Sequence, residues 1–342
     1  MITYLRVSPL LPGGGYTHTV SVVHNLKKNF EVDFIYRTTS GDRFPFLSAF
    51  IAQFRLLKRV KTKITYLRHS SFCILTVFLP FSILEYNGSE AWVKKHWGRG
   101  KFLLPLVWLC EVINIQFADK FVVVSEPLKN ELMQRGIGGG DIFVCPNGVD
   151  VDFFKPQESD ARIGLMIPKN ETVIGFFGTF GPWHGVEDLA YASGFFQETY
   201  LMVGDGSMRL DMQRLFGDAN VRWVGMIQHY QIPNYMNACD ILVLATRPNP
   251  DGTEFFGSPT KLFEYMAVGK CVVASCIGTE GILTDGVDAF IYDPRKGKME
   301  IVFALQRAIN GDRKKMGENA RKKSLEYTWE KTNKKLIDFL KD

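Results

Sequence analysis

Short runs rich in β-branched and aromatic residues alternate with amphipathic stretches along most of this sequence. The runs read EVDFIY, ITYL, SILEY, KFVVVS, IFVCPN, VIGFFG, YLMVG, VRWVG, ILVLA, CVVAS and AFIYD. Segments with helical periodicity, such as HTVSVVHNLKKN, EPLKNELMQRG and SMRLDMQRLFG, lie between most of them. This alternation predicts parallel sheets that are covered by helices on both faces. About eleven such runs are too many for one small sheet.

The length of 342 residues allows two domains, each with its own core. Turn formers and polar residues gather in CPNGVDVDFFKPQESDARIGLMIPKNE, which predicts a linker around residues 150–170. We therefore expect an α/β protein with two Rossmann-like doubly wound domains, at residues 1–155 and 156–322. The C-terminal stretch NARKKSLEYTWEKTNKKLIDFLKD reads as one long amphipathic helix that must dock on a core already built. Its apolar stripe consists of Leu336, Ile337, Phe339 and Leu340.

The composition is that of an ordinary globular protein, with 46% hydrophobic and 23% charged residues. The six cysteines show no C-x-x-C pair and no zinc-like spacing with histidines, so we expect buried, reduced thiols in a cytoplasmic protein. The N-terminus lacks the apolar core and cleavage site of a signal peptide. Two apolar runs, at residues 72–84 and 102–118, are shorter than the roughly 20 residues that a spanning helix needs.

Positive charge is concentrated in the first half of the sequence, within a net charge of +5. Seven basic residues and no acidic residue lie between Arg43 and Leu84. A basic amphipathic segment of this kind can lie on an anionic membrane surface or attract an anionic ligand. The alternative is a solvated helix face. Nucleic acid is not expected as a partner, because no stacking-aromatic or recognition-helix motif accompanies the charge.

Glycines follow several of the predicted strands, where open α/β sheets bind their ligands. Gly13, Gly14 and Gly15 precede a predicted helix, either as a plain turn or as a loop that lets a ligand approach backbone N–H groups. A second loop, GFFGTFGPWHGVEDL, has the arrangement of a phosphate cradle, and its His184 either contacts a phosphate or is merely solvated. Further glycines directly after strands, which suit a flat base lying against the backbone, are Gly204, Gly206 and Gly225.

The strongest local signal is SPTKLFEYMAVGK, at residues 258–270. Ser258 is a good N-cap and Pro259 a good first helical residue, and the following side chains are apolar around most of the helix. A buried carboxylate without a partner costs several kcal/mol, so Glu264 needs a partner. That partner is either Lys261 or an arginine of the chain, or else it is a ligand. In the second case Lys261 meets a diphosphate while Glu264, one turn deeper, accepts hydrogen bonds from a ribose diol.

Taken in order, these motifs resemble the large family of retaining GT-B-fold glycosyltransferases, the glycosyl transferases group 1, which includes bacterial mannosyl- and N-acetylglucosaminyltransferases. The resemblance covers nearly the whole chain, from PGGGYTHTV through VVVSEPLKNEL, VCPNGVDVDFFKP, GFFGTFGPWHGVEDL and LMVGDGSMRL to KLFEYMAVGKCVVAS. It implies two Rossmann-like domains facing across a cleft. It also implies that the C-terminal domain binds a UDP- or GDP-linked sugar, that the N-terminal domain binds the acceptor, and that a terminal helix at 323–342 crosses back.

The resemblance also assigns residues. Glu264 matches the glutamate that holds the ribose, Gly14 and Gly15 match the loop near the diphosphate, and Met226 matches a backbone contact to the base. The family's E-x7-E pattern places its first glutamate at 256, where this chain has Phe256, so Glu254 is the nearest substitute. The remaining donor-side candidates are Gly178, Thr179, His184, Gly204, Ser258, Pro259, Thr260 and Lys261, and those on the acceptor side are Glu85 and Asn87.

The implied reaction is a retaining, metal-independent hexosyl transfer to a hydroxyl of a glycan or lipid-linked acceptor, without a cofactor. Lys261, Glu264 and Glu254 are its candidate catalytic residues, and electrostatic stabilisation of the departing nucleoside diphosphate is the main task. Two alternatives stay open. A nicotinamide-dependent oxidoreductase is disfavoured because no G-x-G-x-x-G is followed by an acid about twenty residues later. A catalytically inactive sugar-nucleotide-binding subunit of a glycan assembly system is favoured by Phe256 at the position of the first glutamate.

Overall fold

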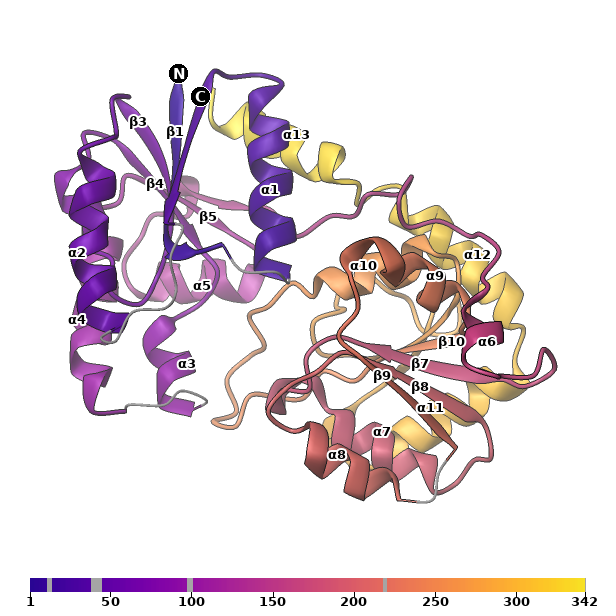
Figure 1. Cartoon of the computed structure of the whole chain (residues 1–342). Helices are drawn as coiled ribbons and strands as arrows, with labels where there is room; N and C mark the ends of the chain where they lie inside the picture. The colour runs from indigo at the N-terminus through magenta and orange to yellow at the C-terminus, as the bar shows by residue number, and fades with distance from the viewer. Residues whose placement is uncertain (11–13, 38–44, 97–100, 218–219, 342) are drawn as a thin grey trace. The chain divides into compact units, whose positions relative to one another are not determined.

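The computed structural model describes residues 1–10, 14–37, 45–96, 101–217 and 220–341. The chain divides into two compact units (Figure 1). Unit 1 comprises Met1–Asn147, Phe256–Ser258 and Trp329–Asp342, and unit 2 comprises Gly148–Phe255 and Pro259–Thr328. Gly13 and Arg43, which the sequence singled out, lie outside the described residues. Among the helices that are described, none is long and apolar enough to cross a membrane.

Unit 1 is built on a six-stranded parallel sheet with the order β2-β1-β3-β4-β5-β6. Its strands are β1 (Ile2–Pro9), β2 (Val32–Arg37), β3 (Ile64–Arg68), β4 (Ser82–Tyr86), β5 (Lys120–Val123) and β6 (Ile142–Val144). Its helices are α1 (Gly14–Lys27), α2 (Pro45–Leu57), α3 (Glu90–His96), α4 (Leu104–Phe117), α5 (Glu126–Gln134) and α13 (Trp329–Phe339), with short 3-10 turns η1 (Leu75–Phe78), η2 (Lys101–Leu103) and η3 (Gly139–Asp141).

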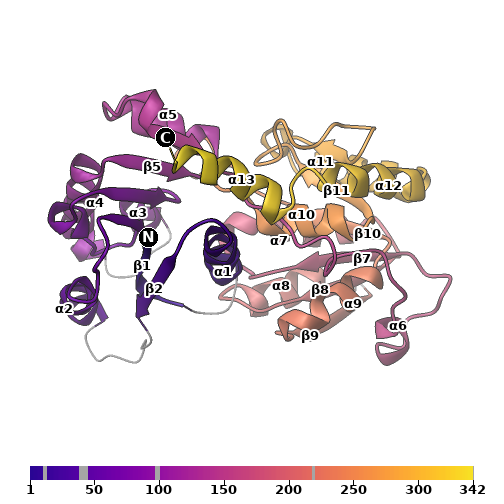
Figure 2. The same ribbon diagram turned by 90° about the horizontal axis from the view of Figure 1, so that it is seen from above.

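Alternate residues of these strands point to opposite faces, and each face carries its own apolar core. Tyr4 packs in one core with residues of α1 and α13, and Leu5 packs in the other with residues of α2 and α5. Figure 2 shows α13 lying alongside α1. The predicted architecture, a parallel sheet covered on both faces, is confirmed for this unit.

The strand β1 was not among the predicted strands, although it lies inside the sheet between β2 and β3. Its polar Thr3 and Arg6 interrupt the apolar pattern of the sequence. Both side chains are buried, and the Arg6 guanidinium donates to the Gly15 carbonyl (3.0 Å) and to Thr19 Oγ1 (2.6 Å). Hydrogen bonds to α1 therefore satisfy a charge that the pattern alone places outside a strand interior.

Unit 2 has a second six-stranded parallel sheet, with the order β12-β11-β10-β7-β8-β9. Its strands are β7 (Val173–Phe177), β8 (Thr199–Val203), β9 (Val221–Gly225), β10 (Ile241–Leu244), β11 (Cys271–Ser275) and β12 (Phe290–Tyr292). Its helices are α6 (Ala161–Gly164), α7 (Val186–Ser193), α8 (Arg209–Phe216), α9 (Ile232–Asn237), α10 (Thr260–Ala267), α11 (Met299–Asn310) and α12 (Arg313–Ser324), with η4 (Pro182–His184), η5 (His229–Gln231) and η6 (Pro294–Lys296). Apolar cores again cover both faces of the sheet.

The C-terminal stretch forms two helices, so the prediction of one long helix was wrong. The helix α12 ends at Ser324, and α13 begins at Trp329. Between them the Tyr327 carbonyl accepts a hydrogen bond from the Val149 N–H (2.9 Å), and Thr328 pairs with Val149 in an isolated bridge. This pairing takes up backbone groups that a continuous helix would use. The apolar stripe of α13 docks on the core of unit 1, where Leu336 is fully buried.

Candidate functional site

The carboxyl ends of β7, β8 and β9 lie at the same edge of the unit 2 sheet. The glycines that follow these strands pack backbone against backbone there. Gly178, directly after β7, donates its N–H to the Val203 carbonyl (3.0 Å), and Gly204 donates to the Gly225 carbonyl (2.8 Å). A Cβ atom on Gly204 would lie 1.9 Å from the Gly178 carbonyl oxygen, so only glycine fits. These glycines are thus needed for the packing of one loop against the next. Met226, which directly follows Gly225, is 68% exposed.

Lys261 lies in the first turn of α10, beside the loop that follows β7. Its Nζ is 3.0 Å from His184 Nδ1 and 4.4 Å from the centroid of the Phe176 ring. A Cβ atom on Gly178 would lie only 3.2 Å from the same Nζ. The structure therefore brings Gly178, His184 and Lys261 together, all three of which the sequence nominated.

The hydrogen bonds of His184 define its tautomer. The indole N–H of Trp183 donates to His184 Nε2 (2.9 Å), and Thr179 Oγ1 lies 3.0 Å from the same atom. Burial, reinforced by the charge of Lys261, lowers the pKa of His184 to about 2, so the ring is neutral. A neutral imidazole with an accepting Nε2 carries its hydrogen on Nδ1. That N–H points at Lys261, which can accept it only as an uncharged amine.

The two charged side chains of α10 influence each other. Burial lowers the pKa of Lys261 to about 7, although the nearby Glu264 favours its ammonium form. Burial likewise raises the pKa of Glu264 to about 7, against the effect of Lys261. Within the described part of the chain, the half-buried Glu264 carboxylate has no hydrogen-bond or ion-pair partner. This α10 pair therefore keeps donor and acceptor capacity for a ligand.

The segment before α10 differs from the prediction. The helix begins at Thr260 with Pro259 as its N-cap, so Ser258 is not the capping residue and Pro259 is not the first helical residue. Ser258 Oγ instead accepts the N–H of Asn147 (3.0 Å), and its carbonyl accepts the Asn147 side-chain amide (2.5 Å). Because both groups of Ser258 are used by Asn147, the hydroxyl does not turn toward the helix.

Phe256 stands where the family pattern has its first glutamate. Its ring packs edge-on against Trp92 at 5.2 Å between centroids, and its carbonyl accepts the Ser125 hydroxyl (2.7 Å). Glu254, two residues earlier, is exposed, and its carbonyl accepts a hydrogen bond from Asn249 (2.8 Å). An apolar side chain thus occupies the position of the acid.

Glu85, at the end of β4 in unit 1, is buried within a polar cluster. Its carboxylate accepts hydrogen bonds from Tyr4 Oη (2.8 Å), Asn87 Nδ2 (2.8 Å) and the Arg68 guanidinium. Burial opposes ionisation, but Arg68 and His18 hold the pKa of Glu85 well below its usual range. The sequence named Glu85 and Asn87, whereas Tyr4, His18 and Arg68 were missed because β1, α1 and β3 supply them from distant positions.

His18 brings a histidine to this cluster. It lies in the second turn of α1, after Gly14 and Gly15, which form the first residues of the helix and do not precede it as predicted. Its Nε2 is 3.0 Å from Glu85 Oε1, and its Nδ1 is 2.6 Å from Asn147 Oδ1. Asn147 in turn donates to the Ser258 carbonyl, which fixes the orientation of its amide. The signal for His18 was present in the quoted motif PGGGYTHTV.

Metal ligands do not gather in the residues described by the structure, since no three His, Cys, Asp or Glu side chains lie close enough to share an ion. Five of the six cysteines are buried, Cys276 is half-buried, and all six are free thiols. Burial raises the pKa of Cys73 to about 11 and that of Cys145 to about 12. These thiols are inert at neutral pH.

Comparison with known proteins gives two family matches and several structural neighbours. Residues 171–310 match the model of glycosyl transferases group 1, and residues 12–153 match that of glycosyltransferase family 4. TuaH of Bacillus subtilis, named as a teichuronic acid biosynthesis glycosyltransferase, is 25% identical over 70% of this chain and 62% of its own length. An uncharacterized glycosyltransferase of Methanocaldococcus jannaschii is 26% identical over 73% of this chain and 65% of its own length. The chain thus spans less than two thirds of the length of these relatives.

Solved structures of similar fold cover nearly the whole chain. Sucrose-phosphate synthase from Thermosynechococcus elongatus has a TM-score of 0.81 at 18% identity, over 99% of this chain and 98% of that protein. HepE from Anabaena, in complex with UDP-glucose, has a TM-score of 0.75 at 18% identity, over 100% and 99% of the two chains. These likenesses show that the two parallel six-stranded sheets form a GT-B fold. With the two family matches covering its two halves, the chain belongs to the glycosyltransferase group 1 and family 4 proteins.

Proposed function

We propose that this protein transfers a hexosyl group from a UDP- or GDP-linked sugar to a hydroxyl of a glycan or lipid-linked acceptor, with retention of configuration. The observation that carries the proposal is the α10 pair. The Glu264 carboxylate, which has no hydrogen-bond or ion-pair partner among the described residues, lies one turn from Lys261, and Lys261 Nζ lies beside the Gly178 loop. A carboxylate suits a ribose diol, and an amine beside bare backbone suits a diphosphate. The names of relatives agree, since HepE is described with UDP-glucose and WaaB as a lipopolysaccharide outer core galactosyltransferase.

The proposed roles follow from the chemistry of the side chains. Lys261 and the positive end of the α10 dipole stabilise the negative charge of the departing nucleoside diphosphate. Glu264 holds the ribose, and Gly204 and Met226 contribute backbone near the base. The leaving phosphate removes the proton of the acceptor hydroxyl on the same face of the sugar. Glu254 is the proposed contact to the donor sugar, and Asn87 beside Glu85 is the proposed contact on the acceptor side.

A second candidate function is that of a catalytically inactive sugar-nucleotide-binding subunit in glycan assembly. The observation in its favour is Phe256, whose ring packs on Trp92 where the family pattern has a glutamate. Release of nucleoside diphosphate from the sugar nucleotide, measured with and without an acceptor extract, separates the two functions. Binding without any turnover would support the inactive subunit.

The donor site is tested by substituting Glu264. Glu264→Ala is expected to weaken binding of the nucleoside diphosphate by about 2–4 kcal/mol, because hydrogen bonds to a charged group are lost. Thermal shift with UDP, GDP and their sugars identifies the donor, since a bound ligand raises the unfolding temperature. Isothermal titration calorimetry then gives the affinity.

The matched control for this substitution is Glu318→Ala. Glu318 is an exposed glutamate of α12, in the same unit but on another helix. Its substitution should leave the nucleotide affinity unchanged. Equal affinities of the wild type and Glu264→Ala would remove the ribose assignment.

A further inference from the structure

The helix α4 of unit 1 buries two polar side chains, Glu111 and Asn114, and exposes four large apolar ones. Its buried residues are Val107, Cys110, Glu111, Asn114 and Ile115. Its exposed apolar residues are Leu106 (41% exposed), Trp108 (55%), Leu109 (48%) and Phe117 (54%). A helix on the surface of a globular protein normally turns its apolar stripe to the core. The helix α4 departs from this rule, so its buried Glu111 and Asn114 need a reason and its exposed apolar residues need an environment.

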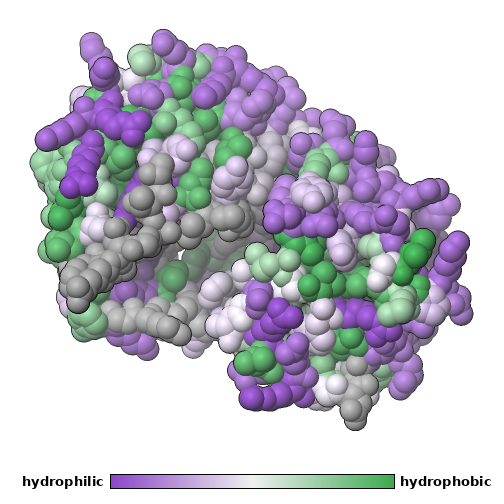
Figure 3. Space-filling view, in the orientation of Figure 1, coloured by the Kyte–Doolittle hydropathy of each residue, from purple (hydrophilic) through white to green (hydrophobic). Residues whose placement is uncertain are grey.

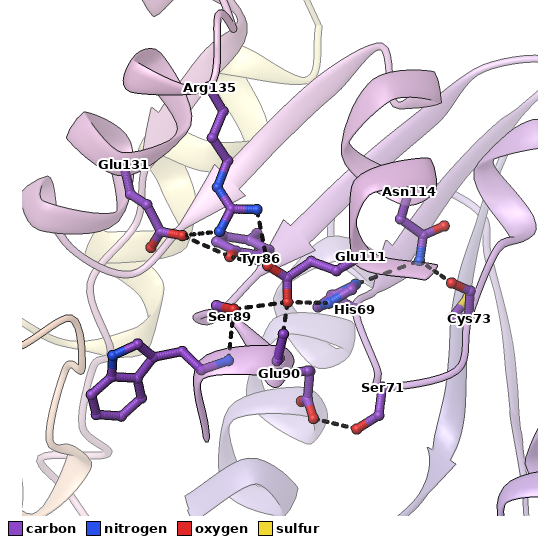
Figure 4. Close-up of polar contacts among 12 residues, drawn as sticks. His69, Ser71, Cys73, Tyr86, Ser89, Glu90, Glu111, Asn114, Glu131 and Arg135 are labelled. Carbon is purple, nitrogen blue, oxygen red and sulfur yellow. Dashed lines mark hydrogen bonds and ion pairs between the residues drawn. The ribbon is translucent and has the colours of Figure 1, made fainter. Parts of the chain in front are cut away.

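Glu111 explains the polar interior (Figure 4). Its Oε2 accepts hydrogen bonds from Ser89 Oγ (3.0 Å) and the Ala91 N–H (3.2 Å), and its Oε1 accepts one from Arg135 (2.9 Å). Burial opposes its ionisation, but the nearby His69, Ser89 and Arg135 lower the pKa of Glu111 to about 2. The buried group is therefore a fully bonded carboxylate, and α3 and α5 hold it from two sides.

Asn114, one turn further along α4, holds the same orientation. Its Nδ2 donates to the Cys73 carbonyl (2.6 Å), and its Oδ1 accepts from Thr76 Oγ1 (2.9 Å). Turning the helix over would break these bonds and would separate the buried Glu111 carboxylate from Ser89, the Ala91 N–H and the part-exposed Arg135. A carboxylate is costly to bury without such partners. The apolar face of α4 is thus fixed outward.

The apolar surface continues from α4 onto its neighbours. The turn η1 lies against α4 and also against α2, where Phe78 meets Phe54 edge-on at 5.7 Å between centroids. Figure 3 shows apolar side chains at its left edge, where α2 lies. We call this set the α4 surface; it comprises Leu47 and Ile51 of α2, Val77 and Phe78 of η1, and Leu106, Trp108 and Leu109 of α4, all 41–55% exposed.

Basic side chains flank the α4 surface on the same elements. Arg55, Lys58 and Arg59 are exposed in the last turn of α2 and directly after it, and Lys101 is exposed in η2, directly before α4. The sequence has no Asp or Glu between Arg43 and Leu84 to neutralise the first three. An apolar patch with tryptophan and a basic rim matches the acyl–headgroup boundary of an anionic bilayer.

We propose that the α4 surface seats unit 1 on an anionic lipid bilayer, with Trp108 and Leu109 inserted at the headgroup level and the basic residues on the lipid phosphates. The occupant is a lipid surface because exposed Trp108 and Leu109 beside several basic side chains match both the apolar and the anionic parts of a bilayer interface. The docking extends the proposed function, since a lipid-linked acceptor is reached from that surface. It is nevertheless tested without donor or acceptor, so its failure leaves the proposed transferase activity untouched.

Vesicle sedimentation tests the docking directly. We expect the wild type to bind vesicles of equal parts phosphatidylcholine and phosphatidylglycerol, and to bind pure phosphatidylcholine far less. Trp108→Ser with Leu109→Ser should weaken binding to the anionic vesicles at least about tenfold. Lys58→Glu with Arg59→Glu should weaken the same binding and reduce its dependence on salt.

The matched control is Leu210→Ser with Leu215→Ser. These leucines of α8 are 68% and 56% exposed, so the change in apolar surface is similar but lies in unit 2. Control and test variants should share the unfolding temperature of the wild type, which shows that both fold. Equal vesicle binding by the Trp108/Leu109 variant and the wild type would overturn the proposal. A dimer that ignores vesicles and dissociates in that variant would overturn it too, by assigning the α4 surface to a second copy.

Discussion

The donor candidate site depends on the protonation of individual side chains in α10. Burial favours the uncharged amine of Lys261, which can accept the Nδ1–H of His184, whereas the side chain needs its proton to meet a diphosphate. Glu264 must lose its proton to accept from a ribose diol. The pKa of Lys261 is lowered to about 7 and that of Glu264 is raised to about 7, so each group changes charge near neutral pH. Donor binding is therefore expected to be sensitive to pH.

We predict that the affinity for the sugar nucleotide passes through a maximum near pH 7. As the pH rises, Lys261 loses its proton and the phosphate loses its cation; as the pH falls, Glu264 gains a proton and the ribose loses its charged acceptor. Each side of the profile is expected to fall by up to about tenfold per pH unit. The sugar nucleotide is used in the calorimetric titration because its diphosphate has no free terminal phosphate that titrates in this range.

His184→Asn should move the alkaline side of this profile to higher pH. The asparagine carbonyl can accept from a Lys261 ammonium group, whereas the Nδ1–H of His184 cannot. His24→Asn, at an exposed histidine of α1, is the control and should leave the profile in place. A profile that does not move in His184→Asn would contradict the deduced tautomer.

Single residues of the site could be predicted from sequence to different degrees. Lys261 and His184 were both nominated, because a charge in an apolar helix and a histidine in a glycine loop stand out locally. Their contact could not be foreseen, since it depends on how α10 meets the loop after β7. His18 and Arg68 were missed for the same reason, as their meeting point on Glu85 exists only once the unit 1 sheet has formed.

At the scale of elements, the hydrophobic pattern predicted eleven of the twelve strands that the structure describes. It failed where buried polar groups are satisfied by distant partners. The pattern misses β1 because the charged Arg6 interrupts its apolar residues. It shows α4 only as an apolar run and does not reveal that Glu111 faces inward. The break between α12 and α13 follows from a backbone pairing with Val149, 179 positions before Thr328 (328 − 149), which no local pattern contains. Local signals thus locate elements, and long-range hydrogen bonds decide their faces and ends.

The docking of α13 leads to a prediction at the same scale. Leu336 is fully buried in the core of unit 1, so Leu336→Ala should lower the free energy of unfolding by about 2–5 kcal/mol. Lys335→Ala changes the exposed neighbour and should alter it by less than about 0.5 kcal/mol. Urea unfolding followed by circular dichroism measures both. An unchanged stability of Leu336→Ala would mean that the helix is not part of the unit 1 core in solution.

At the scale of the whole molecule, the chain supplies two sheets with separate cores and places different chemistry on each. Unit 1 gathers a histidine, an arginine and a buried glutamate at the end of β4, and it carries the α4 surface. Unit 2 gathers glycine backbone, the Lys261 amine and the Glu264 carboxylate at the ends of β7 to β9 and the start of α10. This division agrees with the proposal that unit 2 binds the donor and unit 1 the acceptor.

The proposed roles in unit 2 also predict whether the transfer reaction needs a metal ion. Because Lys261 and the start of α10 are proposed to stabilise the leaving diphosphate, transfer should not require a divalent ion. Activity on the donor identified by thermal shift should therefore be unchanged by EDTA, whereas Lys261→Ala should lower kcat at least about a hundredfold, the loss typical of removing one stabilising group. Lys270→Ala, at a half-buried lysine just after α10, is the control for loss of a cation in unit 2. If EDTA abolished the activity and Mn²⁺ or Mg²⁺ restored it, the prediction would be wrong. A metal ion, and not Lys261, would then stabilise the charge of the leaving diphosphate.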